Sequence, residues 1–285
     1  MPCRNEEWCL GLTLQAILQW VDTVVVLDHA STDHSREIIQ EIQNENRNRV
    51  VFLTDDDPTW HEMAHRQRML EEARKQGATH IALIDADEIL TSNLVSSAHR
   101  RITSVCADIT VEFPWLCLSK STDRVYAAGT WGGSFVSTAF CDFPHLHWSS
   151  TERNGYDFHR RHPLGRDTGP LRFFADRSAG VMHLQFVNDR RLRAKQYLYQ
   201  LTERLRWPNR EPIPETRKRY TFTVEQSESI QTKQVPADWW NGYENLMQFL
   251  QVDAEPWQLL ECHRLLKENP GLGTGLNDFG VMEDL

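Results

Sequence analysis

The sequence predicts an α/β protein with a mostly parallel central sheet and flanking helices. Segments 23–27, 50–53 and 80–84 are short and apolar, as strands buried on both faces are, and amphipathic segments with helical spacing lie between them. Parallel strands need such crossover helices, so this alternation indicates a parallel sheet. Ligands bind sheets of this kind beyond the carboxyl ends of the strands. We therefore expect the functional residues where these strands end.

The helices between the strands follow from spacing and capping. An apolar face at helical spacing predicts a helix over 10–21. Polar residues 28–33 supply N-cap side chains for a second helix, which carries Ile39. A charged amphipathic segment predicts a third helix over 60–76, with Gly77 in the usual position after the C-cap.

The alternation of strand and helix weakens beyond residue 105. Segment 208–236 is polar and weakly patterned, so we expect a linker there and a small helical C-terminal extension that completes 208–285. Four aromatic residues of that extension are interpreted as core residues rather than as a sugar-stacking or membrane-surface patch: Trp239, Trp240, Tyr243 and Trp257. The remaining expected elements are strands at 109–113, 125–127, 134–137 and 180–186, a basic helix over 188–207, and short helices near 237–250 and 256–267.

The composition is that of a folded globular protein. Of 285 residues, 40% are hydrophobic and 25% are charged, which excludes a disordered or fibrous chain. No apolar run approaches the ~20 residues that cross a bilayer, and the N-terminus lacks the basic and then apolar pattern of a signal peptide. The six cysteines include no C-x-x-C pair. We therefore expect reduced thiols and a cytoplasmic location.

The net charge of -9 is unevenly distributed along the chain. Residues 151–220 hold 16 basic and 8 acidic residues, whereas residues 1–150 hold 12 and 21, and residues 221–285 hold 3 and 11. An acidic protein repels nucleic acid, and we expect no nucleic-acid partner. The basic segment can contact a smaller anionic ligand, although a solvated charged face is the simpler interpretation.

Two carboxylates, Asp85 and Asp87, follow the third strand directly. Carboxylates at this spacing can hold Mg²⁺ or Mn²⁺, which bind through one or two protein carboxylates together with substrate phosphates. An Asp-x-Asp pair alone is also common in surface turns and helix caps. Here apolar segments 81–84 and 89–90 flank the pair, and like charges crowded against a core repel one another. This context favours a cation site.

A resemblance rests on four motifs that occur in a familiar order and spacing. They are Arg4-Asn5-Glu6-Glu7, a strand ending in Asp28, a helix with Glu62 and Arg66, and Asp85-Ala86-Asp87-Glu88. The chain resembles the GT-A-fold glycosyltransferases, specifically the glycosyltransferase family 2-like group, over residues 4–100 and more thinly over 101–205. The resemblance implies a Rossmann-like GT-A catalytic domain over 1–207, with a nucleotide-sugar half of about 1–104 and an acceptor half of about 105–207.

The same resemblance implies a metal-dependent glycosyltransferase. Such an enzyme moves a sugar from a nucleotide-sugar donor to an acceptor, usually with inversion, and Mn²⁺ or Mg²⁺ bridges the donor diphosphate. The acceptor, whether a carbohydrate, a lipid-linked molecule or a protein, is not indicated. The alternative is a degenerate GT-A-like domain that binds a glycan or a protein partner without catalysis. Dinucleotide dehydrogenases are disfavoured because no G-x-G-x-x-G follows a strand.

The resemblance also implies roles for individual residues. Asp87 would lie nearest the metal, with Asp85 toward the ribose or donor sugar, and His183 would complete the metal or diphosphate site. For the catalytic base, Asp157 is a weak candidate among several acids of the middle segment. The other residues expected to bind the nucleotide-sugar are Asn5, Glu6, Asp28, Arg66 and Lys195, and the other candidate bases are Asp142, Glu152 and Asp167.

Two features depart from the family pattern. The first strand of the family normally precedes the Arg-Asn-Glu-Glu motif, and only Met1-Pro2-Cys3 stand there in this sequence. Many relatives also carry two adjacent aspartates after the second strand, whereas this chain has Asp28-His29. We therefore leave open the recognition of the base by a second carboxylate.

Overall fold

The computed structural model describes residues 1–59, 61–148, 161–163 and 169–283. The chain forms two compact units that interleave along the sequence, and each is described by itself. The expected boundary near residue 207 falls inside the second unit. The first unit comprises Met1–Leu116, Gly133–His183 and Pro236–Gln251, and the second comprises Cys117–Gly132, Leu184–Val235 and Val252–Leu285.

The first unit contains a parallel sheet of three strands, in the order β1 (Pro2–Cys3), β2 (Val24–His29) and β3 (Val50–Asp55). Every residue of β2 pairs with β3, from Val24 opposite Val50 to His29 opposite Asp55. β1 covers only the end of β2, where Pro2 and Cys3 lie opposite Leu27 and Asp28. The polar residues Asp28 and His29 therefore stand at the carboxyl edge of this sheet, as the sequence predicts.

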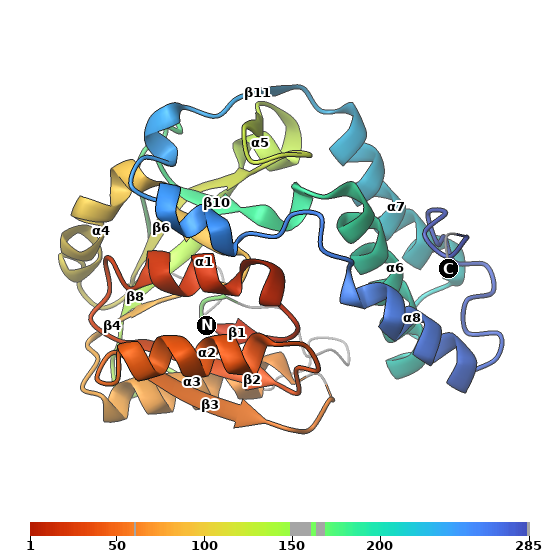
Figure 1. Ribbon diagram of the computed structural model, residues 1–285, viewed down its shortest axis with the longest axis horizontal. Helices are drawn as coiled ribbons and strands as arrows, with labels where there is room; N and C mark the ends of the chain where they lie inside the picture. Colours follow the sequence, from red (N-terminus) through yellow and green to blue (C-terminus); the bar gives the residue numbers. More distant parts are fainter. Residues whose placement is uncertain (60, 149–160, 164–168, 284–285) are drawn as a thin grey trace. The chain divides into compact units, whose positions relative to one another are not determined.

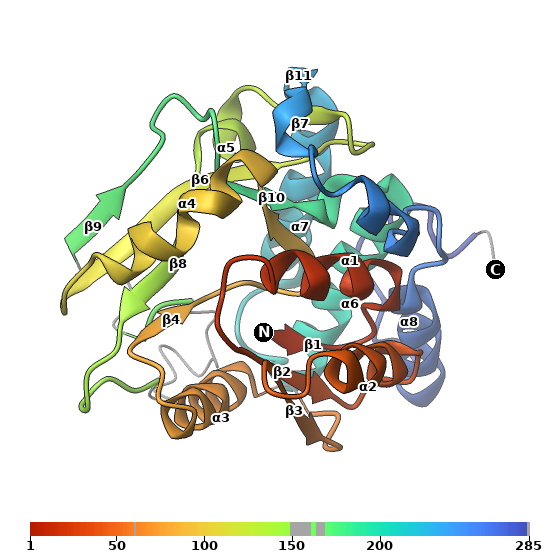
Figure 2. The ribbon, with the colours of Figure 1, turned by 60° about the vertical axis from the view of Figure 1, so that its left-hand side comes forward.

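Helices α1 (Glu7–Ile17), α2 (Ser35–Glu45) and α3 (Glu62–Lys75) connect these strands and lead out of the sheet. α2 packs against β2 and β3 while α3 packs against β2, and Figure 2 shows the sheet between these two helices. α1 ends earlier than its apolar spacing predicts. Its face is buried in the core cluster through Leu10, Leu14 and Ile17.

The second sheet of this unit is largely antiparallel. The expected third parallel strand, β4 (His80–Ala82), pairs antiparallel with β8 (Phe135–Cys141) and not with the first sheet. The edge of this sheet opposite β4 is β5 (Glu88–Leu90), which pairs antiparallel with β10 (Val181–His183). Between them lies β6 (Ile109–Cys117), with β9 (Gly169–Arg172) paired to it in parallel, and α4 (Ser92–Thr103) connects β5 to β6.

Short 3-10 helices, η2 (Ala237–Trp239) and η3 (Glu244–Phe249), replace the expected helix near 237–250 and belong to the first unit. Of the four aromatic residues predicted to lie in the core, Trp239 and Tyr243 are buried, whereas Trp240 and Trp257 are partly exposed. Trp239 Nε1 donates to the carbonyl of Ser178 at 2.9 Å, and the Tyr243 hydroxyl donates to the carbonyl of Leu90 at 3.1 Å.

The second unit is mainly helical, with α6 (Asp189–Arg206), α7 (Ile213–Ser229) and α8 (Trp257–Glu268) (Figure 1). α7 corrects the expectation of an unstructured linker over 208–236. Only Thr216, Val224 and Ser227 of this helix are buried. A helix with so few buried positions needs no apolar stripe, and for this reason its sequence did not predict a helix. The unit also holds the 3-10 helix η1 (Leu184–Phe186), the short α5 (Gly129–Gly133), which ends at the unit boundary, and the strands β7 (Arg124–Tyr126) and β11 (Thr232–Gln234), which pair with each other.

All six cysteines are free thiols. In the part of the chain that the structure describes, no helix combines the length and the apolar character that crossing a membrane requires.

Candidate functional site

The Asp-x-Asp motif forms the turn between β4 and β5. Buried apolar residues flank it, with Ile84 before it and Ile89 after it. α1 holds the turn in place through the carbonyl of Ala86, which accepts hydrogen bonds from Thr13 Oγ1 at 2.7 Å and from Cys9 Sγ at 3.3 Å. The carboxylates therefore project from a backbone that is fixed on both sides.

Asp87 and His183 form a buried pair. Asp87 Oδ2 lies 3.3 Å from His183 Nε2, and the two residues are 7% and 5% exposed. The pairing of β10 with β5 brings them together, because it sets His183 opposite Glu88. Trp115 of β6 stacks on the imidazole, with ring centroids 4.7 Å apart and planes 15° from parallel. The imidazole is thus held in one orientation toward Asp87.

Glu88 is buried and anchors the motif through Arg161. The guanidinium donates to both carboxylate oxygens of Glu88 at 2.7 Å, to Asp85 Oδ2 at 3.3 Å and to the carbonyl of Leu83 at 2.6 Å. Trp115 Nε1 donates to Glu88 Oε1 at 2.9 Å. Burial alone would lower the pKa of Arg161, but the charges of Glu88 and Asp85 outweigh it and raise that pKa. The guanidinium is therefore a permanent positive charge inside the acidic cluster.

Arg66 of α3 reaches the same cluster from the other side. Its Nε donates to Glu62 Oε1 at 2.7 Å and its Nη2 to Asp85 Oδ1 at 3.2 Å, and both ends of the Glu62 pair are buried. As for Arg161, burial opposes the charge while Asp85 and Glu62 raise the pKa of the guanidinium. Arg66 thus ties the acidic motif to α3 through Asp85.

Asn5 and Glu6 connect the end of β1 to the turn after β2. Asn5 adopts a left-handed conformation with φ 54°, which asparagine tolerates better than most residues. Its side-chain Oδ1 accepts from the backbone amide of Thr32 at 2.7 Å, and the backbone amide of Asn5 donates to Ser31 Oγ at 2.9 Å. Glu6 Oε2 accepts from Trp8 Nε1 at 2.7 Å. The described contacts of both side chains hold the protein's own turns together.

Asp28 is fully buried at the carboxyl end of β2. Its Oδ2 accepts from Arg36 Nε at 2.6 Å and from the amide of Ser31 at 3.2 Å. Its Oδ1 is buried with no hydrogen-bond partner among the residues that the structure describes. Buried carboxylate oxygens are normally hydrogen-bonded, so this atom is an acceptor whose donor is not among the described residues.

Two histidines stand beside this edge, where many relatives carry a second aspartate. The rings of His29 and His65 lie 4.4 Å apart, and His65 Nε2 lies 3.2 Å from Asp55 Oδ2. Burial, followed by the charge of His65, lowers the pKa of His29 to about 4. His29 is therefore neutral at pH 7, and its Nε2 donates to the carbonyl of Thr59 at 3.0 Å.

These buried bases make stability depend on pH. Burial lowers the pKa of His162 to about 4 as well, and that of the Met1 amine from 8.0 to about 5. The unfolded chain binds more protons than the native protein below pH 8, so stability falls as pH falls. Between pH 8 and pH 5 we expect the free energy of unfolding to drop by at least about 2 kcal/mol, the contribution of one such histidine. Urea unfolding at both pH values measures this drop.

A matched pair of variants checks the cause of that pH dependence. His29→Gln removes one of the groups with a lowered pKa, and we expect a smaller difference in stability between pH 8 and pH 5. His99 is exposed and lies beside the still more exposed Asp22, so His99→Gln should leave the difference unchanged. Equal pH dependence in the two variants would contradict this explanation.

Four acidic residues of the middle segment and Lys195 complete the set of predicted site residues. Asp157, Glu152 and Asp167 are outside the described residues. Asp142 forms a bidentate pair with Arg74, with both N–O distances 2.7 Å, and this contact ties β8 to α3. Lys195 lies on α6, which belongs to the second unit, whereas the motif belongs to the first.

Trp115 and Arg161 are the site residues that the sequence analysis did not single out. Arg161 belongs to the basic segment 151–220, and the sequence does not show where its side chain points. Trp115 lies in β6, beyond the end of the strand expected at 109–113. In the part of the chain that the structure describes, no group of three or more His, Cys, Asp or Glu side chains is arranged to hold a metal ion. Asp87 and His183 form a two-residue set only.

Comparisons with known proteins assign the family. A sequence model described as Glycosyl transferase family 2 matches residues 1–147, which is more than half of the chain. The chain belongs to glycosyl transferase family 2. The predicted resemblance is thereby confirmed, together with the α/β fold of GT-A type and the assignment of this family 2 protein as a glycosyltransferase.

No curated protein matches this family 2 sequence. Among solved structures, the crystal structure of S. aureus TarS 1–349 aligns with 99% of this chain and 89% of its own, at 13% sequence identity and a TM-score of 0.44.

Proposed function

We propose that this glycosyltransferase transfers a sugar from a nucleotide-sugar donor, with Mn²⁺ or Mg²⁺ held by Asp87 and His183. The observation that carries the proposal is the buried contact between Asp87 and His183. Asp87 lies in a turn that Arg161, Arg66 and α1 hold fixed, and His183 lies on β10. The turn follows β4 and also contains the acidic residue Asp85. The carboxylates would hold the cation, and the positive charge of that cation would stabilise the anion that develops on the leaving diphosphate.

The two side chains fit a small divalent ion. Neighbouring ligands of an octahedral ion with bonds of about 2.1 Å stand about 3 Å apart, and Asp87 Oδ2 and His183 Nε2 are 3.3 Å apart. Two protein ligands suffice, because Mg²⁺ sites commonly take their other ligands from phosphates and water. When bound, the ion would act as a Lewis acid that neutralises charge on the leaving diphosphate.

Other residues support the donor in this proposal. Asp28 Oδ1 would accept a hydrogen bond from a donor group of the ribose or the base, since it is a buried acceptor with no partner among the described residues. Asp85, held between Arg66 and Arg161, would face the ribose or the donor sugar. Arg36 holds Asp28 in place, with an N–O distance of 2.6 Å.

Transfer also needs a group that takes the proton from the acceptor hydroxyl if the configuration is inverted. Asp157 is retained as the proposed base, and inversion is proposed from the family alone. Asp142 is a weaker choice, since both of its carboxylate oxygens are engaged by Arg74. The acceptor is proposed only as a molecule with a nucleophilic hydroxyl.

Calorimetric titration with nucleotides tests donor binding. We expect at least one of UDP, GDP and CDP to bind at least about tenfold more tightly with Mn²⁺ than in EDTA, which corresponds to about 1.4 kcal/mol. The matching monophosphate should show little metal dependence, because it lacks the diphosphate that the ion would bridge. If no nucleotide binds with or without metal, the alternative of a domain that binds a glycan or partner without catalysis would be favoured.

A further inference from the structure

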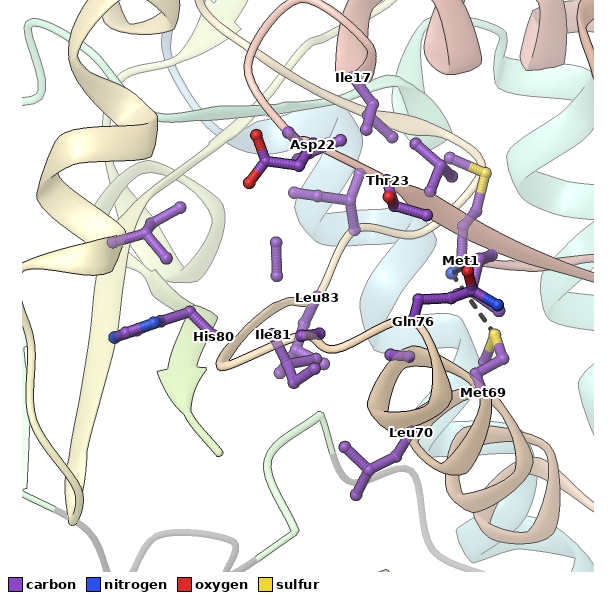
Figure 3. A pocket seen from close by; sticks show the side chains of 18 of the residues that line it. Met1, Ile17, Asp22, Thr23, Met69, Leu70, Gln76, His80, Ile81 and Leu83 are labelled. Atoms are coloured by element: carbon purple, nitrogen blue, oxygen red, sulfur yellow. Dashed lines mark hydrogen bonds between the residues drawn. The ribbon is translucent and has the colours of Figure 1, made fainter. Parts of the chain in front are cut away.

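Figure 3 shows a pocket of about 300 Å³ in the first unit, with Met1 and Leu83 in its wall. Arg66, which contacts the acidic motif, is among the residues that line this pocket, whereas Asp87 and His183 are not. The positions of these two proposed ligands are therefore set by contacts outside the pocket. Two side chains share an ion only while both keep their arrangement, so the groups that fix them matter to the proposed site.

Three adjacent strands of the second sheet carry the groups that surround the imidazole of His183. β10 lies between β6 and β5 in the order of this sheet, and His183 stands opposite Glu88 of β5. Trp115 projects from β6, on the other side of β10, and its indole stacks on the imidazole with the two planes 15° from parallel. The three side chains therefore lie on one face of the sheet, in a row across the strands.

The indole of Trp115 also reaches the third strand of this row. Its Nε1 donates to Glu88 Oε1 at 2.9 Å, and Glu88 Oε2 accepts from the backbone amide of Asp85 at 3.1 Å. Glu88 thus links the indole to the turn that carries Asp87. Through its face the indole contacts one proposed ligand, and through its N–H group it is connected to the turn that bears the other.

The backbone of Trp115 is itself held on both sides. Its amide donates to the carbonyl of Ser134 at 2.9 Å, and its carbonyl accepts from Arg177 Nη2 at 2.6 Å. Nη1 of the same guanidinium donates to the carbonyl of Ser134 at 2.9 Å. With the backbone fixed and the indole N–H engaged, the indole has one orientation. A flat ring held in this way leaves the stacked imidazole little freedom to turn.

We propose that Trp115 is a positioning residue for the metal site: its indole holds the imidazole of His183 toward Asp87 before any ion binds. This inference rests on the proposed function only for the use of that arrangement, which is the binding of Mn²⁺ or Mg²⁺. Because His183 is oriented in advance, binding of the ion does not have to order its side chain, and that ordering would otherwise weaken binding. Loss of a group that orients a metal ligand commonly weakens binding by about 10- to 100-fold.

The test replaces Trp115 with methionine, which is apolar and flexible and presents no flat face. In crystals of the metal-free Trp115→Met protein, we expect the imidazole of His183 to take more than one orientation or to lie farther than 3.3 Å from Asp87 Oδ2. Trp115→Phe keeps a flat ring over the imidazole and removes only the N–H group. We therefore expect Trp115→Phe to retain the orientation of the unmodified protein.

The second measurement is a titration with Mn²⁺ in the presence of UDP, GDP and CDP in turn, followed through the EPR signal of the free ion. Trp115→Met should bind Mn²⁺ at least about tenfold more weakly than the unmodified protein, and Trp115→Phe should recover most of that loss. The matched control is Trp239→Met. Trp239 is 1% exposed and its Nε1 donates to the carbonyl of Ser178, so this variant should lower Tm without weakening the binding of Mn²⁺.

An imidazole of His183 that keeps its single orientation and its contact with Asp87 in the Trp115→Met protein would overturn the proposal, whatever the result with metal. Equal losses of Mn²⁺ affinity in Trp115→Met and Trp239→Met would also overturn it, because a general loss of stability would then explain the effect. If the unmodified protein binds no Mn²⁺, the proposed function fails, and the metal-free crystals still decide the role of Trp115.

A measurement on the unmodified protein covers the case in which Trp115→Met does not fold. The indole ring current should shift the imidazole proton resonances of His183 upfield, and those resonances should report a single conformation, since the ring centroids lie 4.7 Å apart. His183→Gln assigns these resonances by their disappearance. Unshifted resonances of His183 would overturn the proposal.

Discussion

Replacing Asp87 with asparagine lowers sugar transfer by at least about a thousandfold while the protein remains folded. The amide keeps the shape of the side chain and can still contact His183, now 3.3 Å from the carboxylate, but it removes the negative charge. Loss of a single preorganised group that stabilises transition-state charge costs roughly 10²- to 10³-fold, and loss of the proposed ion adds to that. Steady-state kinetics with the donor identified by screening measures the effect.

The control for this variant is Asp22→Asn. The Asp22 side chain is 91% exposed and lies outside the motif, so transfer should be unchanged. Thermal unfolding of both variants shows whether the fold persists. An Asp87→Asn enzyme that keeps more than about a tenth of its activity would contradict the proposed role of this carboxylate in charge stabilisation.

Replacing Arg161 with alanine destabilises the protein by about 3–5 kcal/mol, which is the usual cost of removing one partner from a buried ion pair. Arg161 is the bidentate partner of Glu88, which is fully buried, and it also contacts Asp85. Without the guanidinium, two carboxylates stand together against the core. Urea unfolding at pH 8 measures the loss, and we expect Tm to fall by roughly 6–15 °C.

Arg172→Ala is the matched control for this loss. Arg172 also pairs with a glutamate, at 2.7 Å from Glu112, but its side chain is 57% exposed. Exposed pairs contribute about 0–1 kcal/mol because solvent screens them. Arg161→Lys should recover only part of the stability, since an ammonium cannot make the bidentate contact. A cost for Arg161→Ala no larger than that for Arg172→Ala would contradict the structural role of the buried network.

The acidic motif could be predicted from sequence because its context is local. An apolar segment, two carboxylates and a second apolar segment follow one another within ten residues, so burial and charge can be read together. The position of Asp28 at the edge of the sheet follows from the same kind of context, since it comes directly after the apolar residues 24–27 of β2. In both cases the residues that create the site are neighbours along the chain.

The partners of these carboxylates could not be predicted. Arg161 contacts Glu88 although 73 positions of sequence separate them. Several other arginines lie near it in the sequence, and no spacing pattern distinguishes Arg161 from them. Trp115 stacks on His183 because β6 and β10 belong to one sheet, and that arrangement depends on tertiary pairing. Long-range contacts of this kind leave no periodic signal in a single sequence.

Two elements show where periodicity fails. β4 has the apolar composition of a buried parallel strand, but it pairs with β8 in antiparallel direction. The composition of a strand does not show in which direction its neighbouring strand runs. α7 is polar on most of its surface, so its 17 residues present no stripe at helical spacing. Pro214 in the first turn is compatible with its start, and this was the local signal available.

The most direct test of the proposed function is a panel of nucleotide-sugars incubated with the protein in the presence of Mn²⁺, with release of the nucleotide as the measurement. No acceptor is needed, because such enzymes can transfer the sugar to water. We expect at least one donor to be hydrolysed with Mn²⁺, and we expect that hydrolysis to be lost in EDTA and in the Asp87→Asn protein. A donor consumed equally well in EDTA would contradict the metal site at Asp87 and His183, and a panel in which no donor is consumed or bound would contradict the proposed transfer itself.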